Sequence, residues 1–301
     1  MRNLGRPVTF DVRRLRASLR YLLNHPAFRA QPLRVAGRCV RWDFLRLKTL
    51  DITVRVHGDC VMKLTPPTRG HGVDGLVYCF REFYEPGVRA ALLADLKPGF
   101  VAYDIGANIG LWTLLMSRLV SPTGSVTAFE PVPTTAARLR ANLSLSRADS
   151  ARVEEVALGR TSGTARVFVP TDPGRASLAP ESECDEVFDV PAMRLDDYWV
   201  QTGAPMVNFV KIDAEGSEPR ILAGADQLFG ECRPTVACEV NSAKLGPLGH
   251  RANEIYEFFA RHGYEAYVWV DSRRAFRPSN EMAEGDVLFR PLSDKKACPP
   301  E

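Results

Sequence analysis

The chain has 301 residues, of which 45% are hydrophobic and 25% charged, close to the averages of soluble globular proteins. This composition excludes fibrous, collagenous and wholly disordered proteins, and no uncharged stretch approaches the ~20 residues that a membrane-spanning helix needs. Seven cysteines without a Cys-x-x-Cys pair argue against a disulfide framework or a zinc ribbon. The N-terminus lacks the apolar core of a signal peptide, so we expect a cytoplasmic protein.

The net charge of +3 is unevenly distributed, because residues 1–48 carry +10 and the remainder −7. Val12, Leu15, Leu19 and Leu22 recur at helical spacing with arginines between them, which predicts a basic amphipathic helix. Such a helix either packs its apolar side on the main domain or makes peripheral contact with an anionic membrane. No nucleic-acid module accompanies it, so nucleic acid is not an expected partner.

Two short β-type runs follow the basic segment, and a glycine-rich loop and a helix come after them. The runs are Ile52–Val56 and Cys60–Leu64, the loop extends from Thr65 to Gly75, and the helix from about Pro86 to Leu96. Lys97-Pro98-Gly99 ends this helix.

From Phe100 onward, apolar strands alternate with helical segments, a pattern that predicts βαβ units and a parallel sheet. The expected strands are Phe100–Asp104, Ser125–Phe129, Arg152–Ala157, Asn208–Asp213 and Thr235–Glu239. The expected helices are Leu111–Leu119, Thr134–Leu145 and Glu218–Leu228. Near the C-terminus, a helix at Asn253–His262 and strands at Tyr264–Val270 and Asp286–Phe289 predict an antiparallel hairpin that closes one edge of the sheet.

The segment from Thr171 to Asp197 has no helical period. Its second half, residues 181–197, contains seven acidic residues and one basic residue. We expect either an active-site lid or a solvated insertion, because long loops at a catalytic edge have both roles.

A glycine turn follows the first strand of the expected sheet. The strand ends near Asp104, and Gly106 and Gly110 allow a tight turn and a close approach of a ligand to the backbone. The helix that begins behind them offers unpaired N–H groups. Glu130, at the end of the next strand, stands where an acidic residue typically receives two ribose hydroxyls.

The residues of this turn discriminate between two cofactors. A nicotinamide site needs glycine where this chain has Asn108 and Leu111, and Asp104 would repel a pyrophosphate. S-adenosylmethionine (SAM) carries an ammonium and a sulfonium but no phosphate, so a carboxylate favours it. The turn therefore predicts SAM, and an NAD-dependent oxidoreductase is the less favoured alternative.

Two motifs resemble the FkbM family of SAM-dependent methyltransferases. The first is Asp104-Ile-Gly-Ala-Asn-Ile-Gly110 with Phe129-Glu130-Pro131, and the second is Lys211-Ile-Asp-Ala-Glu-Gly-Ser-Glu218. The resemblance extends over residues 80–290. Shorter similarities lie at Tyr84-Glu85-Pro86, Val156-Ala157-Leu158-Gly159, Ser177-Leu178 and Leu195-Asp196-Asp197.

The resemblance implies an α/β, Rossmann-like class I methyltransferase fold with a mostly parallel seven-stranded sheet and a C-terminal antiparallel hairpin. We expect residues 1–75 to form a basic N-terminal extension with a short helix and strands, residues 76–292 the methyltransferase domain, and residues 293–301 a flexible tail. The expected cofactor-binding residues are Asp104, Gly106, Ala107, Asn108, Gly110, Glu130, Pro131, Glu155 and Val156.

The second motif supplies the expected catalytic residues. Asp213 and Glu215 follow the fourth strand at the ligand-binding edge of the sheet, with Lys211 before them and Glu239 at the end of the fifth strand. Either a carboxylate removes the proton of the acceptor, or Asp213 and Glu215 hold a divalent cation that does so. The sequence does not require a metal.

Three further residues have two interpretations each. Glu218 either contributes to the site or stabilises the helix dipole. His71 and His250 are alternative bases in loops, and each is more simply a surface residue.

We expect O-methylation of a hydroxyl on a sugar, glycan or polyketide-like small molecule. A non-catalytic binding or scaffold protein that retains the fold is the alternative from another class. The sequence leaves the acceptor, O- against N-methylation and the oligomeric state open.

Overall fold

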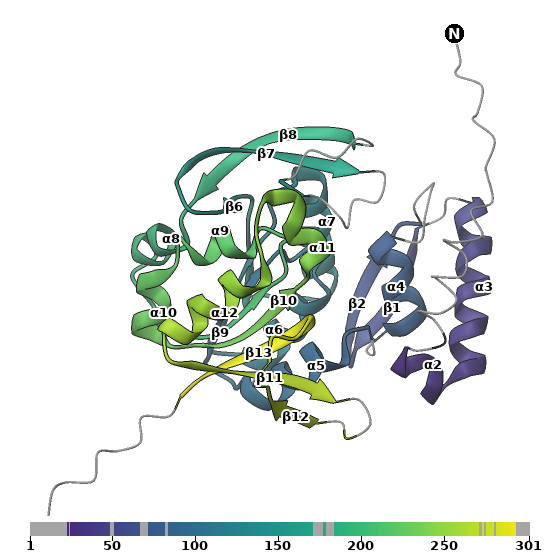
Figure 1. Cartoon of the computed structure of the whole chain (residues 1–301). Coiled ribbons are helices and arrows are strands. Elements are labelled where there is room, and N and C mark those ends of the chain that lie inside the picture. The colour runs from purple at the N-terminus through teal and green to yellow at the C-terminus, as the bar shows by residue number, and fades with distance from the viewer. Residues whose placement is uncertain are drawn as a thin grey trace, which may run out of the picture.

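The computed structural model describes residues 23, 25–48, 51–66, 72–81, 84–170, 177–178, 184–270, 273, 275–279 and 281–292 (Figure 1). The helix predicted around Val12 to Leu22, the tail from residue 293 and His71 lie outside these residues. In the described part of the chain, no helix combines the length and apolarity required to cross a bilayer. The six cysteines described there are free thiols.

An eight-stranded sheet forms the centre of the molecule, in the order β12-β11-β13-β10-β9-β3-β4-β5. The five strands from β10 to β5 pair in parallel, and β13 is antiparallel to both β10 and β11. The bounds are β3 Val101–Ile105, β4 Ser125–Phe129, β5 Ala151–Glu154, β9 Val207–Ile212, β10 Thr235–Val240, β11 Tyr264–Val270, β12 Ala275–Pro278 and β13 Gly285–Pro291. This confirms the predicted Rossmann-like fold, with β12 as one further edge strand.

The strand order reverses between β3 and β9. The chain enters the sheet at β3, continues outward to β4 and β5, and returns to β9 on the other side of β3. Open α/β sheets bind ligands in the crevice at the carboxyl ends of the strands at such a reversal. In the register of these two strands, Asp104 lies opposite Lys211 and Ile105 opposite Ile212.

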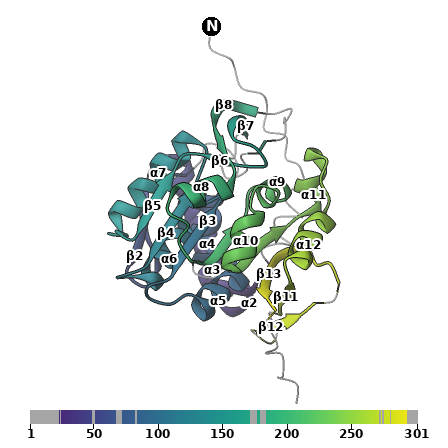
Figure 2. The same ribbon diagram turned by 90° about the vertical axis from the view of Figure 1, so that its left-hand side faces the viewer.

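Helices cover both faces of the sheet (Figure 2). On β3, Ala102 belongs to one hydrophobic core and Tyr103 to the other, as the alternation of side chains along a strand requires. The helices α5 Pro86–Asp95, α6 Leu111–Val120 and α7 Pro133–Leu145 pack into the first core. The second core receives α8 Leu195–Gln201, α9 Glu218–Leu222, α10 Asp226–Cys232 and α12 Ala252–Arg261.

The single helix predicted over Glu218–Leu228 is wrong, because the chain forms two helices there, α9 and α10. The break falls at Gly224, where a Cβ atom would lie 2.2 Å from the carbonyl oxygen of Gly159. Asp196, at the start of α8, accepts backbone hydrogen bonds from Gln227 and Leu228 and thereby fixes the start of α10.

The N-terminal elements pack on the same core as α6. They are α2 Pro26–Ala30, α3 Pro32–Lys48, the antiparallel hairpin β1 Ile52–His57 and β2 Cys60–Leu64, and α4 Gly72–Phe80. Both predicted β runs are strands of this hairpin, and part of the predicted loop is α4. The amide of Lys63 donates to Oδ1 of Asn142 on α7 at 2.8 Å, and the buried Trp42 and Met62 share a core with Leu114.

A second, three-stranded sheet stands above the central sheet, with β8 Cys184–Met193 between β6 Ala157–Leu158 and β7 Gly163–Pro170 (Figure 1). In the segment predicted to be an active-site lid or a solvated insertion, the described residues from 184 onward form β8 and the start of α8. Its role as a lid stays a prediction. Val190 packs inward with Val167, while Val187 and Asp189 are exposed on the outer face. The alternation is obscured in the sequence because Glu186 shares the face of the buried Val169, whereas the apolar Val187 is exposed. The strand predicted over Arg152–Ala157 is divided between β5 and β6.

Candidate active site

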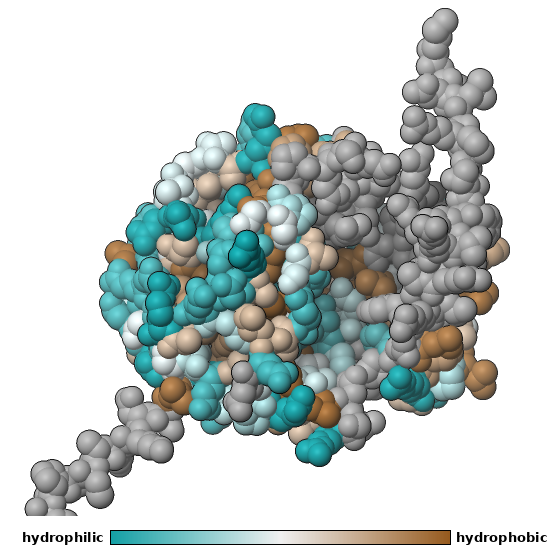
Figure 3. Space-filling view, in the orientation of Figure 1, coloured by the Kyte–Doolittle hydropathy of each residue, from teal (hydrophilic) through white to brown (hydrophobic). Residues whose placement is uncertain are grey.

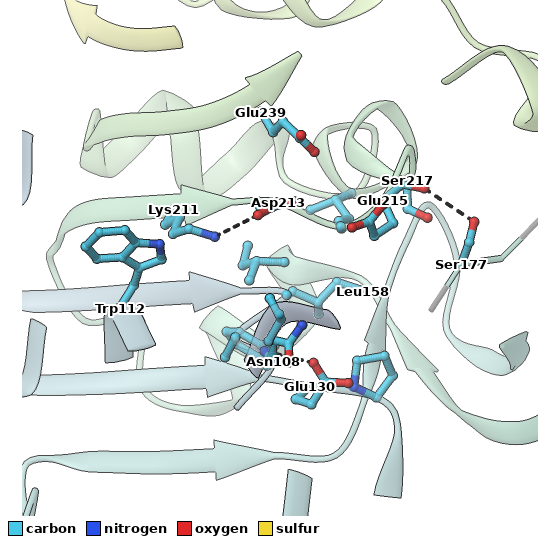
Figure 4. Close-up of a pocket in the computed structure, with 18 of the residues that line it drawn as sticks. Asn108, Trp112, Glu130, Leu158, Ser177, Lys211, Asp213, Glu215, Ser217 and Glu239 are labelled. Atoms are coloured by element: carbon cyan, nitrogen blue, oxygen red, sulfur yellow. Dashed lines mark hydrogen bonds and ion pairs between the residues drawn. The ribbon is translucent and has the colours of Figure 1, made fainter. Parts of the chain in front are cut away.

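One cavity lies at the carboxyl ends of β3, β4, β9 and β10, at the reversal of strand order (Figure 4). Asn108 and Glu130 stand on one side of it, and Asp213, Glu215 and Glu239 on the other. Its wall contains these predicted residues: Gly106, Ala107, Asn108, Glu130, Pro131, Val156, Lys211, Asp213, Glu215 and Glu239.

The turn after β3 depends on glycine. Gly106 has φ +75°, and a Cβ atom on it would lie 1.8 Å from the carbonyl oxygen of Asp213. The backbones after β3 and β9 therefore touch at the floor of the cavity. Gly110, at φ +94°, is similarly close to Leu139, with 2.4 Å between its hypothetical Cβ and Cδ1. Any other residue at either position would have to move the backbone or a packed side chain.

Glu130 is held by the backbone of the same turn. Its carboxylate accepts a hydrogen bond from the amide of Asn108 and another from the amide of Val132, both at 3.0 Å. Burial raises the pKa of Glu130 to about 7 against the opposing effect of these two hydrogen bonds. Each carboxylate oxygen retains a further acceptor position, so Glu130 can still receive hydroxyl groups from a ligand in the cavity.

Three predicted cofactor-binding residues, Asp104, Gly110 and Glu155, do not line the cavity. Asp104 is fully buried beneath the turn, where its Oδ2 accepts from Oγ1 of Thr113 at 2.6 Å. Its Oδ1 is buried without a hydrogen-bond partner among the described residues. Glu155 turns away from the cavity to pair with Arg140. A position just beyond a strand does not determine which way a side chain turns, and an arginine on α7 attracts Glu155 outward.

Lys211 is a buried cation among carboxylates. Its Nζ lies 3.3 Å from Oδ2 of Asp213, the contact drawn in Figure 4. Burial alone would lower the pKa of Lys211, but nearby carboxylates, led by Asp213 and Asp104, raise it above its ordinary value. In turn, burial opposes ionisation of Asp213, yet Lys211 and Lys244 hold its pKa below the usual range. Lys211 thus stays protonated and Asp213 ionised at neutral pH.

Lys244 joins two of the predicted acids and was not foreseen. Its Nζ lies 2.9 Å from Oε2 of Glu215 and 2.8 Å from Oε2 of Glu239. It belongs to α11, Ser242–Leu245. The backbone of Lys244 packs closely on Gly216, where a Cβ atom would lie 2.3 Å from the carbonyl oxygen of Lys244. Glycine at this position therefore allows α11 to approach the cavity. A single lysine beyond the fifth strand gives no sequence signal of this contact.

Glu215 and Glu239 have pKa values near neutrality. Burial raises the pKa of Glu215 to about 7, although Lys244 opposes the shift. For Glu239, burial and the charge of Asp213 raise the pKa to about 8, again against Lys244. A general base is most effective when its pKa lies near the working pH. These two carboxyl groups therefore suit proton transfer better than Asp213 does.

Glu218 has a structural role in this geometry. It is buried, and its Oε1 accepts from the amides of Ala214 and Gly216 at 2.9 and 3.2 Å, which fixes the turn after β9. His250 lies away from the cavity wall, where its Nδ1 faces Glu254 at 2.9 Å and its Nε2 accepts from Arg220. The histidine alternatives to a carboxylate base thus find no support at His250.

Carboxylate oxygens of Asp213, Glu218 and Glu239 lie within 4.8 Å of one another. This set differs from the predicted metal pair, which was Asp213 with Glu215. Glu218 is bound to two backbone amides, Asp213 to Lys211 and Glu239 to Lys244, so protein donors already serve each carboxylate.

Two further carboxyl groups near Lys211 belong to Glu85 and Asp286, and Trp112 binds the first of them. Nε1 of Trp112 donates to Oε2 of Glu85 at 2.7 Å, and both residues line the cavity. Burial, with Asp286 nearby, raises the pKa of Glu85, and burial with Asp213 raises that of Asp286 to about 6. Only Tyr84-Glu85 had a sequence signal, through the family resemblance. Asp286 faces Glu239 across the β10–β13 pair, a register that no local motif indicates.

Comparison with known proteins gives one family. A profile of the methyltransferase FkbM domain matches residues 104–266. The 31-O-demethyl-FK506 methyltransferase FkbM of Streptomyces tacrolimicus is 28% identical over 224 residues, which cover 64% of this chain and 84% of that protein. The 2-O-methyltransferase NoeI of Sinorhizobium fredii is 28% identical over 153 residues, which cover 46% and 62%. Among solved structures, methyltransferase FkbM from Methylobacillus flagellatus has 16% identity and a TM-score of 0.41, over 89% of this chain and 62% of that one.

Proposed function

The chain belongs to the FkbM family of SAM-dependent methyltransferases, and from this premise we propose that it methylates a hydroxyl oxygen. The acceptor that we infer is a sugar, a glycan or a polyketide-like small molecule. The observation that carries the proposal is the pairing, in one cavity, of a glycine turn with Glu130 on one side and near-neutral carboxyls on the other. The names of two relatives add support, because both specify O-methylation.

The cofactor side of the cavity fits SAM. Gly106 has no side chain, so the cavity floor stays open. Glu130, at the end of β4, offers free acceptor positions to the two ribose hydroxyls. Ala107, Asn108 and Pro131 extend this wall, and Val156 adds an apolar contact on the adenine side. When bound, SAM supplies a methyl group already activated by the sulfonium.

The opposite side handles the acceptor. A hydroxyl must lose its proton as the new bond to carbon forms, and a positioned carboxylate that accepts it accelerates transfer about 10²–10⁴-fold. Glu215 and Glu239 have the matched pKa values, so we assign the proton to one of them. Asp213 is the fixed negative charge that orients the acceptor, and Lys211 keeps it ionised.

The protein cations make a divalent metal unnecessary in this proposal. Lys211 and Lys244 already form ion pairs with three of the carboxylates that a metal would need as ligands. Transfer that persists undiminished in EDTA is the expected outcome. Loss of activity in EDTA, restored by magnesium, would instead assign the acids to metal binding.

The test is methyl transfer from labelled SAM to a panel of hydroxyl acceptors, with amine analogues as controls. We expect label in an ether-linked methyl group on a hydroxyl acceptor, and loss of that label with Asp213→Asn while S-adenosylhomocysteine (SAH) still binds. Label only in the amines would refute O-methylation. SAH binding without transfer to any acceptor would favour a scaffold protein that retains the fold.

A further inference from the structure

Helix α3 carries apolar residues on two opposite faces. Val35 and Trp42 are buried against the rest of the molecule, whereas Leu33, Val40 and Phe44 are 88%, 72% and 55% exposed. At about 100° per residue, the three exposed residues fall within about 40° of one another around the helix. We call Leu33, Val40 and Phe44 the outer stripe. Packing within the described part of the chain accounts for the first face and leaves the outer stripe uncovered.

The outer stripe lies at an edge of the molecule. Figure 1 shows α3 as the outermost helix beside α4 and β1, far from α10 and α12. In the same orientation, Figure 3 shows brown, apolar surface at this edge over α2 and α3. Exposed apolar side chains that align on one helix face mark an interaction surface more often than isolated ones do.

Arginines line a groove between α3, β1 and the end of α4. They are Arg34, Arg38, Arg41, Arg55 and Arg81. The acidic residue of this groove, Asp51, is neutralised by Lys63, whose Nζ lies 2.6 Å from its Oδ2. In the described ranges, no carboxylate forms an ion pair with any of the five arginines. We call these five residues the arginine groove.

The arginine groove concentrates like charge in a partly buried place. The guanidinium of Arg81 lies over the Tyr78 ring, 4.6 Å from its centroid, and its buried Nη1 has no hydrogen-bond partner among the described residues. Burial and the charges of Arg38 and Arg41 lower the pKa of Arg81. Cations crowded in this way without a counter-charge favour an anion from outside the chain.

We propose that the outer stripe and the arginine groove together bind an anionic phospholipid membrane. The stripe enters the boundary between headgroups and acyl chains, and the groove receives lipid phosphates. A second copy of the chain fits less well, because a symmetric interface would bring two arginine grooves together. The net charge of +10 over residues 1–48 adds to the attraction.

The two sites share a helix. On α4, Val73 and Val77 line the catalytic cavity, whereas Tyr78 lines the arginine groove. A membrane on this face would therefore lie against the side of the molecule that carries the α4 wall of the cavity. The proposal does not depend on O-methylation, since lipid binding and methyl transfer are measured separately.

The test is co-sedimentation of the full chain with vesicles of phosphatidylcholine alone or mixed with phosphatidylglycerol. We expect binding to the mixed vesicles that weakens as salt is added. The variant L33S/V40S/F44S should lose most of it. The variant R34Q/R41Q/R55Q should lose about fivefold per arginine.

Matched variants on other surfaces serve as controls. V187S/V200S/M206S removes three exposed apolar residues elsewhere, and R160Q/R273Q/R277Q removes three exposed arginines. Both should bind vesicles like the unaltered chain, and all four variants should keep the thermal unfolding and SAH affinity of the parent. Equal losses in the control variants would overturn the proposal, since they would reveal a general charge or surface effect.

Two other outcomes would also overturn it. Calorimetric binding of inorganic phosphate without any binding to vesicles would make the groove a site for a free phosphate. A dimer by light scattering that L33S/V40S/F44S converts to monomer, with no vesicle binding, would assign the stripe to a second copy of the chain.

Discussion

The two sides of the catalytic cavity are built in different ways. The cofactor side is local, because the turn after β3 and the end of β4 hold Glu130 through backbone amides close in the chain. The acceptor side is assembled from distant elements, in which Lys244 of α11 joins Glu215 after β9 to Glu239 of β10. The first depends on backbone shape and the second on charge.

This difference predicts different failures. A substitution on the cofactor side should disturb folding and cofactor binding together, because the backbone leaves no room. A substitution on the acceptor side should leave the fold and the cofactor affinity in place and change turnover and its dependence on pH. Substitutions and changes of pH test this separation, from the largest expected effect to the smallest.

Gly106→Ala should have the largest effect. Its Cβ would lie 1.8 Å from a backbone oxygen at φ +75°, so we expect a loss of at least about 3 kcal/mol in unfolding free energy and no measurable SAH binding. Gly203→Ala is the matched control, since Gly203 has φ +88° but open space around it. It should cost about 1 kcal/mol and leave SAH affinity unchanged. Equal losses in the two variants, measured by denaturant unfolding, would show that φ alone matters.

Lys244→Met should lower turnover at neutral pH about 100-fold or more while SAH affinity is retained. Without the cation, burial and mutual repulsion raise the pKa values of Glu215 and Glu239 further, so both carboxyls stay protonated. Lys63→Met removes the exposed ion pair with Asp51. It should change neither the activation free energy of turnover nor the free energy of unfolding by more than about 1 kcal/mol. Normal turnover by Lys244→Met would show that the ion pairs of Lys244 do not contribute to catalysis.

Activity should rise with pH through about 7 to 8, because the base works in its deprotonated form and the pKa values of Glu215 and Glu239 are about 7 and 8. Glu215→Gln and Glu239→Gln, compared by pH profiles of kcat/KM, identify the base. The variant at the base loses turnover at every pH, and the other keeps a rising limb. A profile that is flat from pH 6 to 9 in the unaltered enzyme would contradict the assignment.

Stability should change with pH in the opposite sense. The pKa of Glu239 in the folded protein is raised above the ordinary value of about 4.3. Its contribution to stability is therefore complete below that value and is lost as the pH rises through about 8. Glu239→Gln should flatten this decline in thermal unfolding experiments. A steeper decline in the variant would show that the carboxylate stabilises the fold at high pH.

Trp112→Phe should lower the free energy of unfolding by about 1–2 kcal/mol, because one hydrogen bond to a buried carboxyl is lost. Trp199→Phe is its counterpart, since Nε1 of Trp199 donates to the carbonyl of Pro205 outside the cavity. Both variants should lose similar stability, but only Trp112→Phe should alter kcat or KM. Equal changes of kcat or KM in the two variants would show that the kinetic changes come from reduced stability.

The sequence was sufficient for the fold and, in the local half of the site, for the positions of Gly106 and Glu130 in the cavity wall. Gly106 and Glu130 were predictable because a strand, a turn and a helix follow one another in a short stretch with a strict steric requirement. Lys244 and Asp286 were not, because their contacts depend on how α11 and β13 pack, which no spacing encodes. Asp104 and Glu155 were assigned to the cavity from their positions in the chain, yet packing turned one inward and the other outward.

Calorimetric titration with SAH of the unaltered chain, Glu130→Gln and Asp213→Asn tests the separation of the two sides most directly. We predict that Glu130→Gln loses affinity more than about tenfold, because one oxygen cannot keep the backbone contacts and accept two hydroxyls. Asp213→Asn should bind SAH like the unaltered chain and fail in methyl transfer. Unchanged affinity of Glu130→Gln in a folded protein, or loss of SAH binding by Asp213→Asn, would contradict the account.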